Sequence, residues 1–241
     1  MSAIVVTGDS RGLGAAVVAD LLESTDHDGI GLSRSETEQV DTLSADYPNR
    51  YHHLTFDLVE TPEIEALYKD ELKPRGPIEG LVNNAAIGYD DLVTNVDIGR
   101  LEQMMHVNVL SPIVLTKYVL RDMLLNRTDG ALVHVSSVST ATGYKGLSMY
   151  AASKAALEGF SRNVAREWGE RGIRSNAVVP GFMETDMTAD LSERQRDRIY
   201  ERTGLGEPTD IGSVVDTIHF LLSDDARSIT GETVRIDSGT L

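Results

Sequence analysis

Tyr150 and Lys154, in the segment Tyr150-Ala-Ala-Ser-Lys154, are the residues whose types and spacing point most directly to chemistry. Positions i and i+4 of a helix share a face, so the phenol and the ammonium are expected to be neighbours. One positive charge about 5 Å from a phenol supplies on the order of 3 kcal/mol toward lowering its pKa from ~10. The spacing therefore predicts that Lys154 lowers the pKa of Tyr150 toward neutrality, although most such pairs are an exposed tyrosine beside a solvated lysine.

Ser137 lies thirteen residues before Tyr150, at the end of an apolar segment that is expected to be a strand. Reduction of a carbonyl builds negative charge on its oxygen, which a hydroxyl donor and a proton source offset in a water-poor crevice. Ser137 and Tyr150 would supply these two donors.

The segment Thr7-Gly-Asp-Ser-Arg-Gly-Leu-Gly14 follows the first expected strand. Its glycines permit a tight turn and let backbone amides and a helix N-terminus approach a phosphate. The spacing G-x-x-x-G-x-G differs from the G-x-G-x-x-G dinucleotide fingerprint. The residues expected to bind the coenzyme in this loop are Gly8, Ser10, Arg11, Gly12, Leu13 and Gly14.

Ser33-Arg34 stands about twenty residues further on, where an NAD enzyme places an acidic residue for the adenosine ribose. With Arg11, this position would offer two guanidiniums to a 2′-phosphate. The pattern predicts NADP(H) in preference to NAD(H), the alternative being that Arg34 is a solvated surface residue.

Short apolar runs alternate with longer amphipathic stretches along the whole chain, which is typical of a parallel sheet with helices on both faces. The expected fold is α/β, a Rossmann-type doubly wound sheet of seven parallel strands, in one domain spanning residues 1–241. Leu157, Phe160, Val164 and Trp168 recur at helical spacing after Tyr150, and Gly172 is expected to stop that helix. The expected strands are Ala3–Thr7, Gly29–Ser33, His52–Asp57, Gly80–Asn83, Ala131–Ser136, Arg174–Val179 and Glu232–Asp237.

Polar or backbone-exposing residues follow six of these strands in succession, and ligands of open α/β sheets bind outside the carboxyl ends of the strands. We therefore expect a binding crevice at this edge.

Composition narrows the class of protein. The chain of 241 residues has no cysteine and a net charge of −16, which argues against disulfides and against nucleic-acid or anionic-membrane partners. No apolar run is long enough to span a membrane, and the first expected strand begins almost at Met1, so neither a membrane anchor nor a signal peptide is expected. A cytoplasmic location is expected. The six histidines show no ligand spacing, and no metal is predicted.

Together these motifs resemble the short-chain dehydrogenase/reductase family over essentially the whole chain. The matching segments are TGDSRGLG at 7–14, Asp57-Leu58, NNAA at 83–86, Asn108, Ser137, YAASK at 150–154 and PGFMET at 180–185. Within the family the chain is most similar to 3-oxoacyl-acyl-carrier-protein reductases, on the segments 166–188, 205–212 and 228–239.

The resemblance implies a role for each matching residue. Tyr150 would protonate the substrate oxygen, Lys154 would bind the nicotinamide ribose, Ser137 would hold the carbonyl, and Asn108 would position a water. An asparagine in an amphipathic helix is, on its own, more often exposed. The other residues implied to lie against the coenzyme are Asp57, Leu58, Asn83, Ala85, Pro180, Gly181, Met183 and Thr185.

The implied reaction is NADPH-dependent reduction of a 3-oxoacyl thioester carried by an acyl carrier protein. Arg127 and Arg171 are candidates for a docking patch beside the crevice, although acidic residues surround both and the net charge would repel an acidic carrier. The alternatives are a reductase or dehydrogenase of a small free ketone or alcohol, such as a sugar or steroid, and an NADP-binding regulator without turnover. The family also implies a homotetramer that pairs the carboxyl-terminal segment and the helices expected near Gly99–Arg127 and Ser148–Arg171.

Three residues depart from the family pattern: Asp9 in the phosphate loop, Ala86 in place of a glycine, and Ser238 in place of another. Asp9 is expected to point away from the pyrophosphate or to be paired, with Arg11 as one candidate partner. Residues 182–202, rich in Met, Arg and Glu, are expected to form a lid over the substrate.

Overall fold

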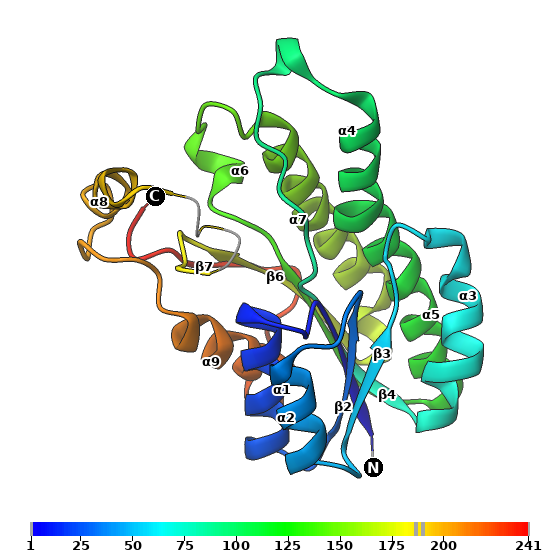
Figure 1. The fold of residues 1–241 in the computed structure, drawn as a ribbon. Helices are drawn as coiled ribbons and strands as arrows, with labels where there is room; N and C mark the ends of the chain where they lie inside the picture. The colour runs from blue at the N-terminus through cyan, green and yellow to red at the C-terminus, as the bar shows by residue number, and fades with distance from the viewer. Residues whose placement is uncertain (1, 186–187, 189–190, 241) are drawn as a thin grey trace.

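The computed structural model describes residues 2–185, 188 and 191–240 of the chain (Figure 1). Within these ranges, seven parallel strands form one sheet in the order β3-β2-β1-β4-β5-β6-β7, which confirms the predicted doubly wound fold. The strands are β1 Ala3–Thr7, β2 Asp28–Ser33, β3 Tyr51–Thr55, β4 Ile78–Asn83, β5 Gly130–Val135, β6 Ile173–Pro180 and β7 Thr233–Ile236.

The strands are apolar because helices cover both faces of the sheet. Every residue of β1 and of β5 is buried, as expected for strands of a parallel sheet that is packed on both sides. The predicted strands are all present. β1 has its predicted bounds, and the other six differ by one or two residues at one or both ends; β3 ends at Thr55, before Asp57.

Helices α1 Gly12–Ser24, α2 Glu38–Asp46 and α9 Ile211–Leu222 pack on one face of the sheet (Figure 1). Helices α3 Ile64–Leu67, α5 Ser111–Asn126 and α7 Ser148–Trp168 pack on the other face. The remaining α-helices are α4 Ile98–Met105, α6 Ser139–Thr142 and α8 Glu193–Tyr200. Short 3₁₀ turns occur at Thr61–Glu63, Lys73–Arg75, Val93–Asn95, Gly169–Arg171 and Asp224–Ala226, and π-helical turns at Tyr68–Leu72 and His106–Leu110.

Helix α7 carries Tyr150 and Lys154 and is held by the predicted apolar stripe. Leu157 and Val164 are buried, and Phe160 and Trp168 pack against the same core. After a 3₁₀ turn, the segment ends at Gly172, whose φ of +76° lies in the left-handed region that glycine adopts without strain.

The helix expected over Gly99–Arg127 is interrupted. It consists of α4, the π-helical turn His106–Leu110 and α5. A π turn holds one extra residue, which reorients the side chains that follow, and such turns often occur at functional sites. Asn108 lies in this turn.

Because all seven strands are parallel, the segments after their carboxyl ends gather at one edge of the sheet. That edge is where the sequence predicts a crevice. A helix that crosses a bilayer needs a long apolar stretch, and none of the helices in the described ranges has one.

Candidate active site

Helix α7 places Tyr150 and Lys154 beside the carboxyl end of β5. The Lys154 side chain is only 2% exposed, and its Nζ donates a hydrogen bond of 2.8 Å to the backbone carbonyl of Val135. The same Nζ lies 5.9 Å from the centre of the Tyr150 ring. The structure therefore brings the two residues together on one face of the helix, as their spacing predicts.

The pKa values of this pair shift in opposite directions. Burial raises the pKa of Tyr150 to about 12, and a hydrogen bond with Ser137 acts against that rise. Burial lowers the pKa of Lys154 to about 8. The prediction that Lys154 lowers the pKa of Tyr150 is thus not what the structure shows, because Tyr150 packs against the small apolar cluster formed by Tyr89, Met104 and Met149. At neutral pH the phenol is protonated and able to donate.

Ser137 lies just after β5 and is partly exposed at the same edge. Its Oγ accepts a hydrogen bond of 3.2 Å from the amide of Ser139, in the first turn of α6. The hydroxyl is thereby oriented within reach of Tyr150. This arrangement places two hydroxyl groups where a carbonyl oxygen could meet both.

Asn108 is fully buried, which differs from the exposed position that is usual for an asparagine in an amphipathic helix. Its Oδ1 accepts from the amide of Ile87 at 2.9 Å, and its Nδ2 donates to the carbonyl of Ile87 at 3.0 Å and to Ser153 Oγ at 3.1 Å. Asn108 therefore ties the π turn to α7, one residue before Lys154, and to the segment after β4.

The glycine-rich loop between β1 and α1 is shaped to admit an anion. Gly8 and Gly12 have φ of +75° and +55°, and a Cβ on Gly14 would lie 2.1 Å from the carbonyl oxygen of Gly8. Within the described residues, the first amides of α1 receive no side-chain cap. Uncapped amides at a helix N-terminus suit a phosphate.

A groove of about 440 Å³ opens beside this loop. The methyl carbon Cγ2 of Thr185 lies 3.9 Å from the place of a Cβ on Gly12, so the two residues face each other across the groove. The residues of the chain thus fit the pyrophosphate of a dinucleotide. The lining residues are Ser10, Arg11, Gly12, Thr37, Glu38, Gln39, Glu184, Thr185 and Ile211.

Asp9 points away from this groove, which is one of the two arrangements that the sequence predicts for it. Its carboxylate is fully buried and accepts hydrogen bonds from Tyr51 at 2.5 Å and from Nδ1 of His53 at 2.7 Å. The partners of Asp9 are therefore Tyr51 and His53 on β3, and not the candidate partner Arg11.

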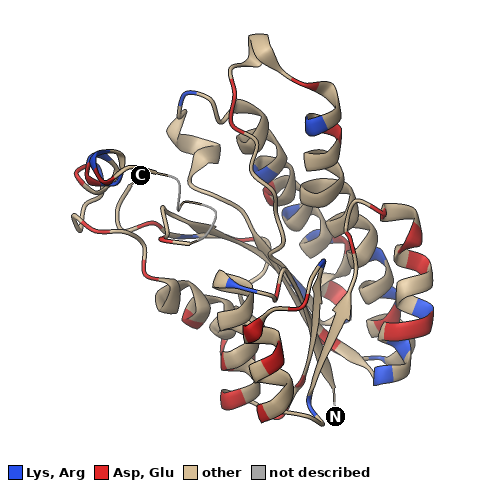
Figure 2. Cartoon of the chain, in the orientation of Figure 1, with Lys and Arg blue, Asp and Glu red and all other residues tan. Residues whose placement is uncertain are grey.

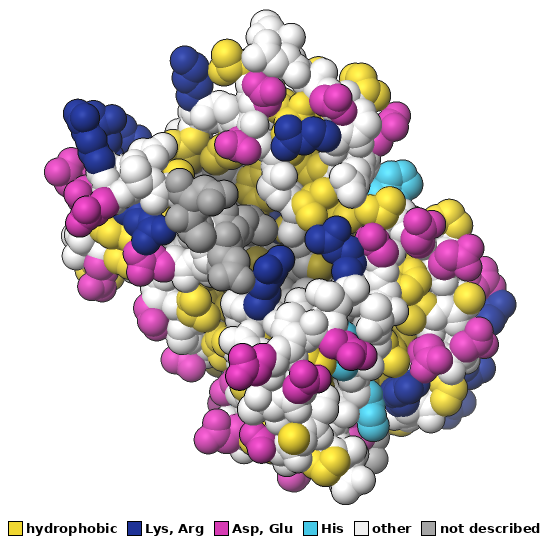
Figure 3. Space-filling model, viewed as in Figure 1, with side chains coloured by type: hydrophobic (Ala, Val, Ile, Leu, Met, Phe, Trp, Pro, Cys, Tyr) yellow, Lys and Arg dark blue, Asp and Glu magenta, His cyan; other side chains and the backbone are white. Residues whose placement is uncertain are grey.

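Ser33 ends β2, and its hydroxyl donates to the carbonyl of Ser35 at 3.1 Å. Arg34 follows in the exposed loop, at the same edge as Arg11. Some Lys and Arg side chains lie near the centre of this face, while Asp and Glu side chains are frequent on the helices below it (Figure 3). Figure 2 shows acidic side chains along α1, α2 and α3. Two acidic residues, Glu38 at the start of α2 and Glu184, line the groove together with Arg11.

The predicted contacts after β3 and β4 fall at the same edge. Leu58 is buried, and the Asp57 carboxylate accepts from the amide of Val59 at 3.0 Å. The Asn83 side chain turns into the interior, where it donates to Thr116 and to His134 at 3.1 Å each. Only the backbone of Asn83 is therefore available to the crevice.

The segment after β6 borders the groove on its far side. Gly181 is tightly enclosed, since a Cβ there would lie 2.4 Å from Thr209 Oγ1, and its amide donates to the carbonyl of Ile236. Thr188 Oγ1 donates to the carbonyl of Met183 at 2.9 Å and accepts from the amide of Thr185 at 3.0 Å. Of the predicted lid, residues 186, 187, 189 and 190 lie outside the described residues.

Two residues of this edge were missed as functional residues, although both lie in motifs that the sequence shows. The Thr7 hydroxyl accepts from the amides of Asn84 and Ala85 at 3.0 Å each. The Asn84 side chain donates to the carbonyl of Thr7 at 2.9 Å. These bonds join the glycine loop to the segment after β4. The signal in the sequence is a polar residue at the carboxyl end of each of two strands, Thr7 for β1 and Asn84 for β4.

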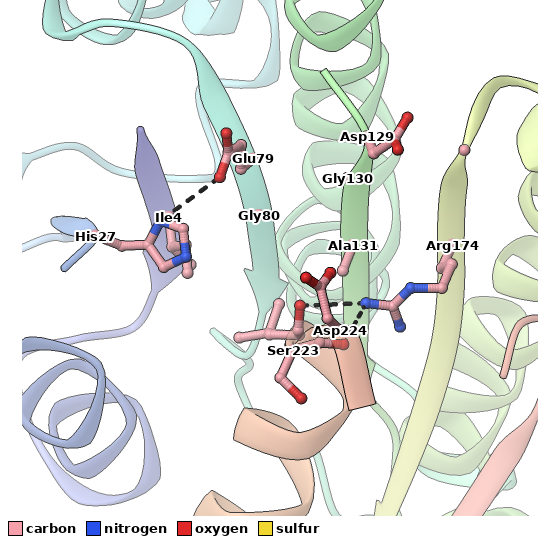
Figure 4. Close-up of a pocket in the computed structure, with 12 residues that line it drawn as sticks. Ile4, His27, Glu79, Gly80, Asp129, Gly130, Ala131, Arg174, Ser223 and Asp224 are labelled. Atoms are coloured by element: carbon pink, nitrogen blue, oxygen red, sulfur yellow. Dashed lines mark hydrogen bonds and ion pairs between the residues drawn. The ribbon is translucent and has the colours of Figure 1, made fainter. Parts of the chain in front are cut away.

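A second hollow, of about 340 Å³, lies at the opposite edge, by the amino ends of the strands (Figure 4). Its polar groups bind each other: Arg174 donates to the carbonyls of Leu221, Leu222 and Ser223, and His27 lies 3.6 Å from Glu79. It is remote from the crevice.

Arg127 and Arg171 also lie toward this opposite edge, because they precede β5 and β6. The expectation that they flank the crevice of their own chain is therefore wrong. Residues just before parallel strands gather at the amino edge, whereas Tyr150 lies by the carboxyl edge. Among the described residues, no group of three or more His, Cys, Asp or Glu side chains is arranged to hold a metal ion.

Comparison with known proteins decides the family. A family model described as "Enoyl-(Acyl carrier protein) reductase" matches residues 8–240. The 3-oxoacyl-(acyl-carrier-protein) reductases FabG of Haemophilus influenzae and Escherichia coli are 34% and 35% identical over 235 residues, which cover 98% of this chain and 96% and 95% of those proteins. The chain is a member of the short-chain dehydrogenase/reductase family. The resemblance inferred from the motifs is confirmed.

Two solved structures share the fold over nearly their whole length. A 4-hydroxyisoleucine dehydrogenase complexed with NADH has a TM-score of 0.93 at 26% identity, covering 100% of this chain and 98% of that one. A blue fluorescent protein from a metagenomic library, in complex with NADPH, has a TM-score of 0.90 at 30% identity, covering 99% and 97%. As a short-chain dehydrogenase/reductase, the protein is an oxidoreductase that uses a nicotinamide coenzyme and acts on an alcohol or a ketone.

Proposed function

We propose that this short-chain dehydrogenase/reductase reduces a 3-oxoacyl thioester to the 3-hydroxyacyl thioester with NADPH. The observation that carries the proposal is the convergence of Ser137, Tyr150 and buried Lys154 at the carboxyl end of β5. The relatives that are 34% and 35% identical over 98% of the chain bear the name of this activity. Their similarity supports the choice of substrate class.

In this mechanism the bound coenzyme would supply the hydride. Tyr150, kept protonated by burial, donates its proton to the carbonyl oxygen of the substrate as negative charge develops there. Ser137 donates a second hydrogen bond to that oxygen. The positive charge of Lys154 beside the phenol stabilises the tyrosinate that is left after proton transfer. The Lys154 ammonium then returns a proton to the tyrosinate.

Asn108 holds the π turn against Ser153 and so fixes the position of the neighbouring Lys154 on α7. Asp57, Leu58, Asn83 and Ala85 would border the adenosine. The segment that includes Pro180, Gly181, Met183 and Thr185 would border the nicotinamide, with residues 182–202 as a lid over the substrate.

Preference for NADPH is supported by Arg11 and Arg34 and by the lack of a carboxylate at the end of β2, where Ser33 stands instead. Structural relatives occur with NADH and with NADPH, so the fold takes both coenzymes. Direct titration with each coenzyme tests the preference, and tighter binding of NADH would contradict it.

An acyl carrier protein is the proposed partner, as the names of the relatives suggest. Arg127 and Arg171 could meet a carrier bound at a crevice only if a neighbouring chain places them there. That requirement fits a homotetramer. Size-exclusion chromatography with light scattering tests the assembly.

A second candidate is oxidation or reduction of a small free hydroxy or keto compound. The observation in its favour is the TM-score of 0.93 with a 4-hydroxyisoleucine dehydrogenase. An NADP-binding regulator is the third candidate, and the presence of Ser137, Tyr150 and Lys154 close together at one edge disfavours it.

The deciding experiment follows NADPH consumption by absorbance with acetoacetyl thioesters, free and carrier-bound, and then with a panel of ketones. Turnover of the thioesters is expected. Turnover of free ketones alone would favour the second candidate, and no turnover with any of them would favour the regulator.

A further inference from the structure

The carboxylate of Asp9 is buried inside the loop that borders the coenzyme groove. Its Oδ2 accepts from Tyr51 at 2.5 Å and from His53 at 2.7 Å, and both donors lie on β3, more than forty residues away along the chain. The side chains of Asp9 and His53 are 0% and 6% exposed. Asp9 therefore fastens the coenzyme loop to the edge strand of the sheet.

Gly31, on the intervening strand β2, makes room for this contact. A Cβ on Gly31 would lie 1.6 Å from Oδ2 of Asp9, so no larger residue could occupy this position with the carboxylate in place. Gly31 is also the register partner of His53. The carboxylate thus crosses β2 at a glycine to reach the strand beyond it.

The position of the Asp9 carboxylate affects how well the groove accepts a negatively charged phosphate. Asp9 immediately precedes Ser10 and Arg11 of the phosphate groove, and Gly31 stands two residues before Ser33 and three before Arg34. A negative charge here repels a phosphate in the groove, and it repels a coenzyme with a 2′-phosphate more strongly than one without.

Two donors hold the carboxylate on the β3 side. Burial and the hydrogen bond to Asp9 raise the pKa of Tyr51 far above its ordinary value, so its hydroxyl remains a donor. Oδ1 of Asp9 and Nε2 of His53 have no hydrogen-bond partner among the described residues. The loss of His53 is therefore not compensated by a bond to the other carboxylate oxygen.

We propose that His53 is a positioning residue that sets coenzyme preference: by holding the Asp9 carboxylate against β3, it lets an acidic phosphate loop accept a coenzyme that carries a 2′-phosphate. The proposal rests on the NADPH preference put forward above. His53 acts through Asp9 and not by contact with the coenzyme.

The test measures dissociation constants for NADPH and NADH by fluorescence titration in wild type, His53→Leu and Asp9→Ala/His53→Leu. His53→Leu is expected to weaken NADPH binding about tenfold and NADH binding about threefold or less, because the freed carboxylate acts most strongly on the more highly charged coenzyme. The second substitution removes the carboxylate and is expected to return the NADPH/NADH ratio to within about twofold of wild type.

His52→Leu is the matched control, since His52 is adjacent on β3 and its side chain points to the opposite face. It should leave the ratio unchanged. Urea unfolding of each variant without coenzyme separates binding from stability. If His53→Leu does not fold, Tyr51→Phe removes the other donor and keeps the ring, and a smaller shift of the ratio in the same direction is expected.

Equal weakening of both coenzymes, or failure of Asp9→Ala to restore the ratio, would overturn the proposal and leave His53 a structural residue. A wild type that prefers NADH would contradict the proposed coenzyme. That result is independent of the first, because the shift in the ratio is measured relative to wild type.

Discussion

The Nζ of Lys154 lies 5.9 Å from the centre of the Tyr150 ring, while its hydrogen bond goes to the carbonyl of Val135. The lysine is thus placed to act on the phenol through its charge and not through a direct bond. Burial lowers the pKa of Lys154 to about 8 and raises that of Tyr150 to about 12. The pair therefore holds a protonated phenol beside an ammonium that can release its proton near neutral pH.

Replacement of Tyr150 by Phe is expected to lower the reduction rate at least a hundredfold, since the proton donor is lost. Coenzyme binding should be retained, because the groove of about 440 Å³ is lined by other residues. Steady-state rates and NADPH titration check both statements. Tyr144→Phe, in the loop before α7, is the matched control, and near-normal turnover of the Tyr150 variant would remove that residue from its assigned role.

Replacement of Lys154 by Met is expected to abolish turnover and yet to stabilise the fold at neutral pH. Shifting the pKa of a buried lysine from 10.5 to about 8 corresponds to about 3 kcal/mol of unfavourable charge burial. Loss of the hydrogen bond to Val135 offsets about 1 kcal/mol of that gain. Urea unfolding near pH 7 should show a net gain of about 1–2 kcal/mol.

The pH dependence of that gain has a definite sign. Between about 8 and 10.5 the unfolded chain holds the Lys154 proton while the folded chain has lost it, so wild type becomes more stable as pH rises through this window. The advantage of the Met variant should therefore shrink over the same window. An advantage that stays constant with pH would show that the lysine is not the titrating group.

The fold could be predicted from the sequence because its strands are apolar on both faces. β1 matches its expected range of Ala3–Thr7, and the end of the 3₁₀ turn after α7 at Gly172 follows from a residue type that favours positive φ. The i,i+4 spacing of Tyr150 and Lys154 likewise required only local geometry. These features depend on residues close together in the chain.

Properties that depend on tertiary contacts were not predictable in the same way. The direction of the Tyr150 pKa shift depends on the apolar cluster with Met104 and Met149, which the spacing does not reveal. The partners of Asp9 lie on a strand that pairs with β2, so they could be found only once the register was known. The location of Arg127 and Arg171 at the amino edge of the sheet could have been predicted from the sequence, because both residues precede expected strands.

Replacement of Ser238 by Gly is expected to stabilise the protein by about 0.5–1 kcal/mol, because Ser238 has a φ of +54°, which costs a residue with a Cβ more than glycine. Arg127, with φ of +55° at the end of α5, should respond in the same direction. Ser35→Gly, in an exposed loop and without positive φ, is the control and should be neutral or slightly destabilising. Thermal unfolding compares the three, and destabilisation by Ser238→Gly would mean that the hydroxyl contact with Pro208 matters more.

Replacement of Gly31 by Ala is expected to destabilise the fold by about 2–4 kcal/mol, because the new methyl group would overlap the Asp9 carboxylate. In an Asp9→Ala background the overlapping carboxylate is gone and the nearest remaining atom is the Cβ of residue 9, at 3.0 Å, so the same substitution should cost at most about half as much. Gly29→Ala on the same strand, where a Cβ would meet its nearest neighbour at 3.5 Å, is the matched control. Urea midpoints measure this cycle. If Gly31→Ala costs the same with and without the carboxylate, the glycine serves the pairing of β2 with its neighbours and not the passage of Asp9 to β3.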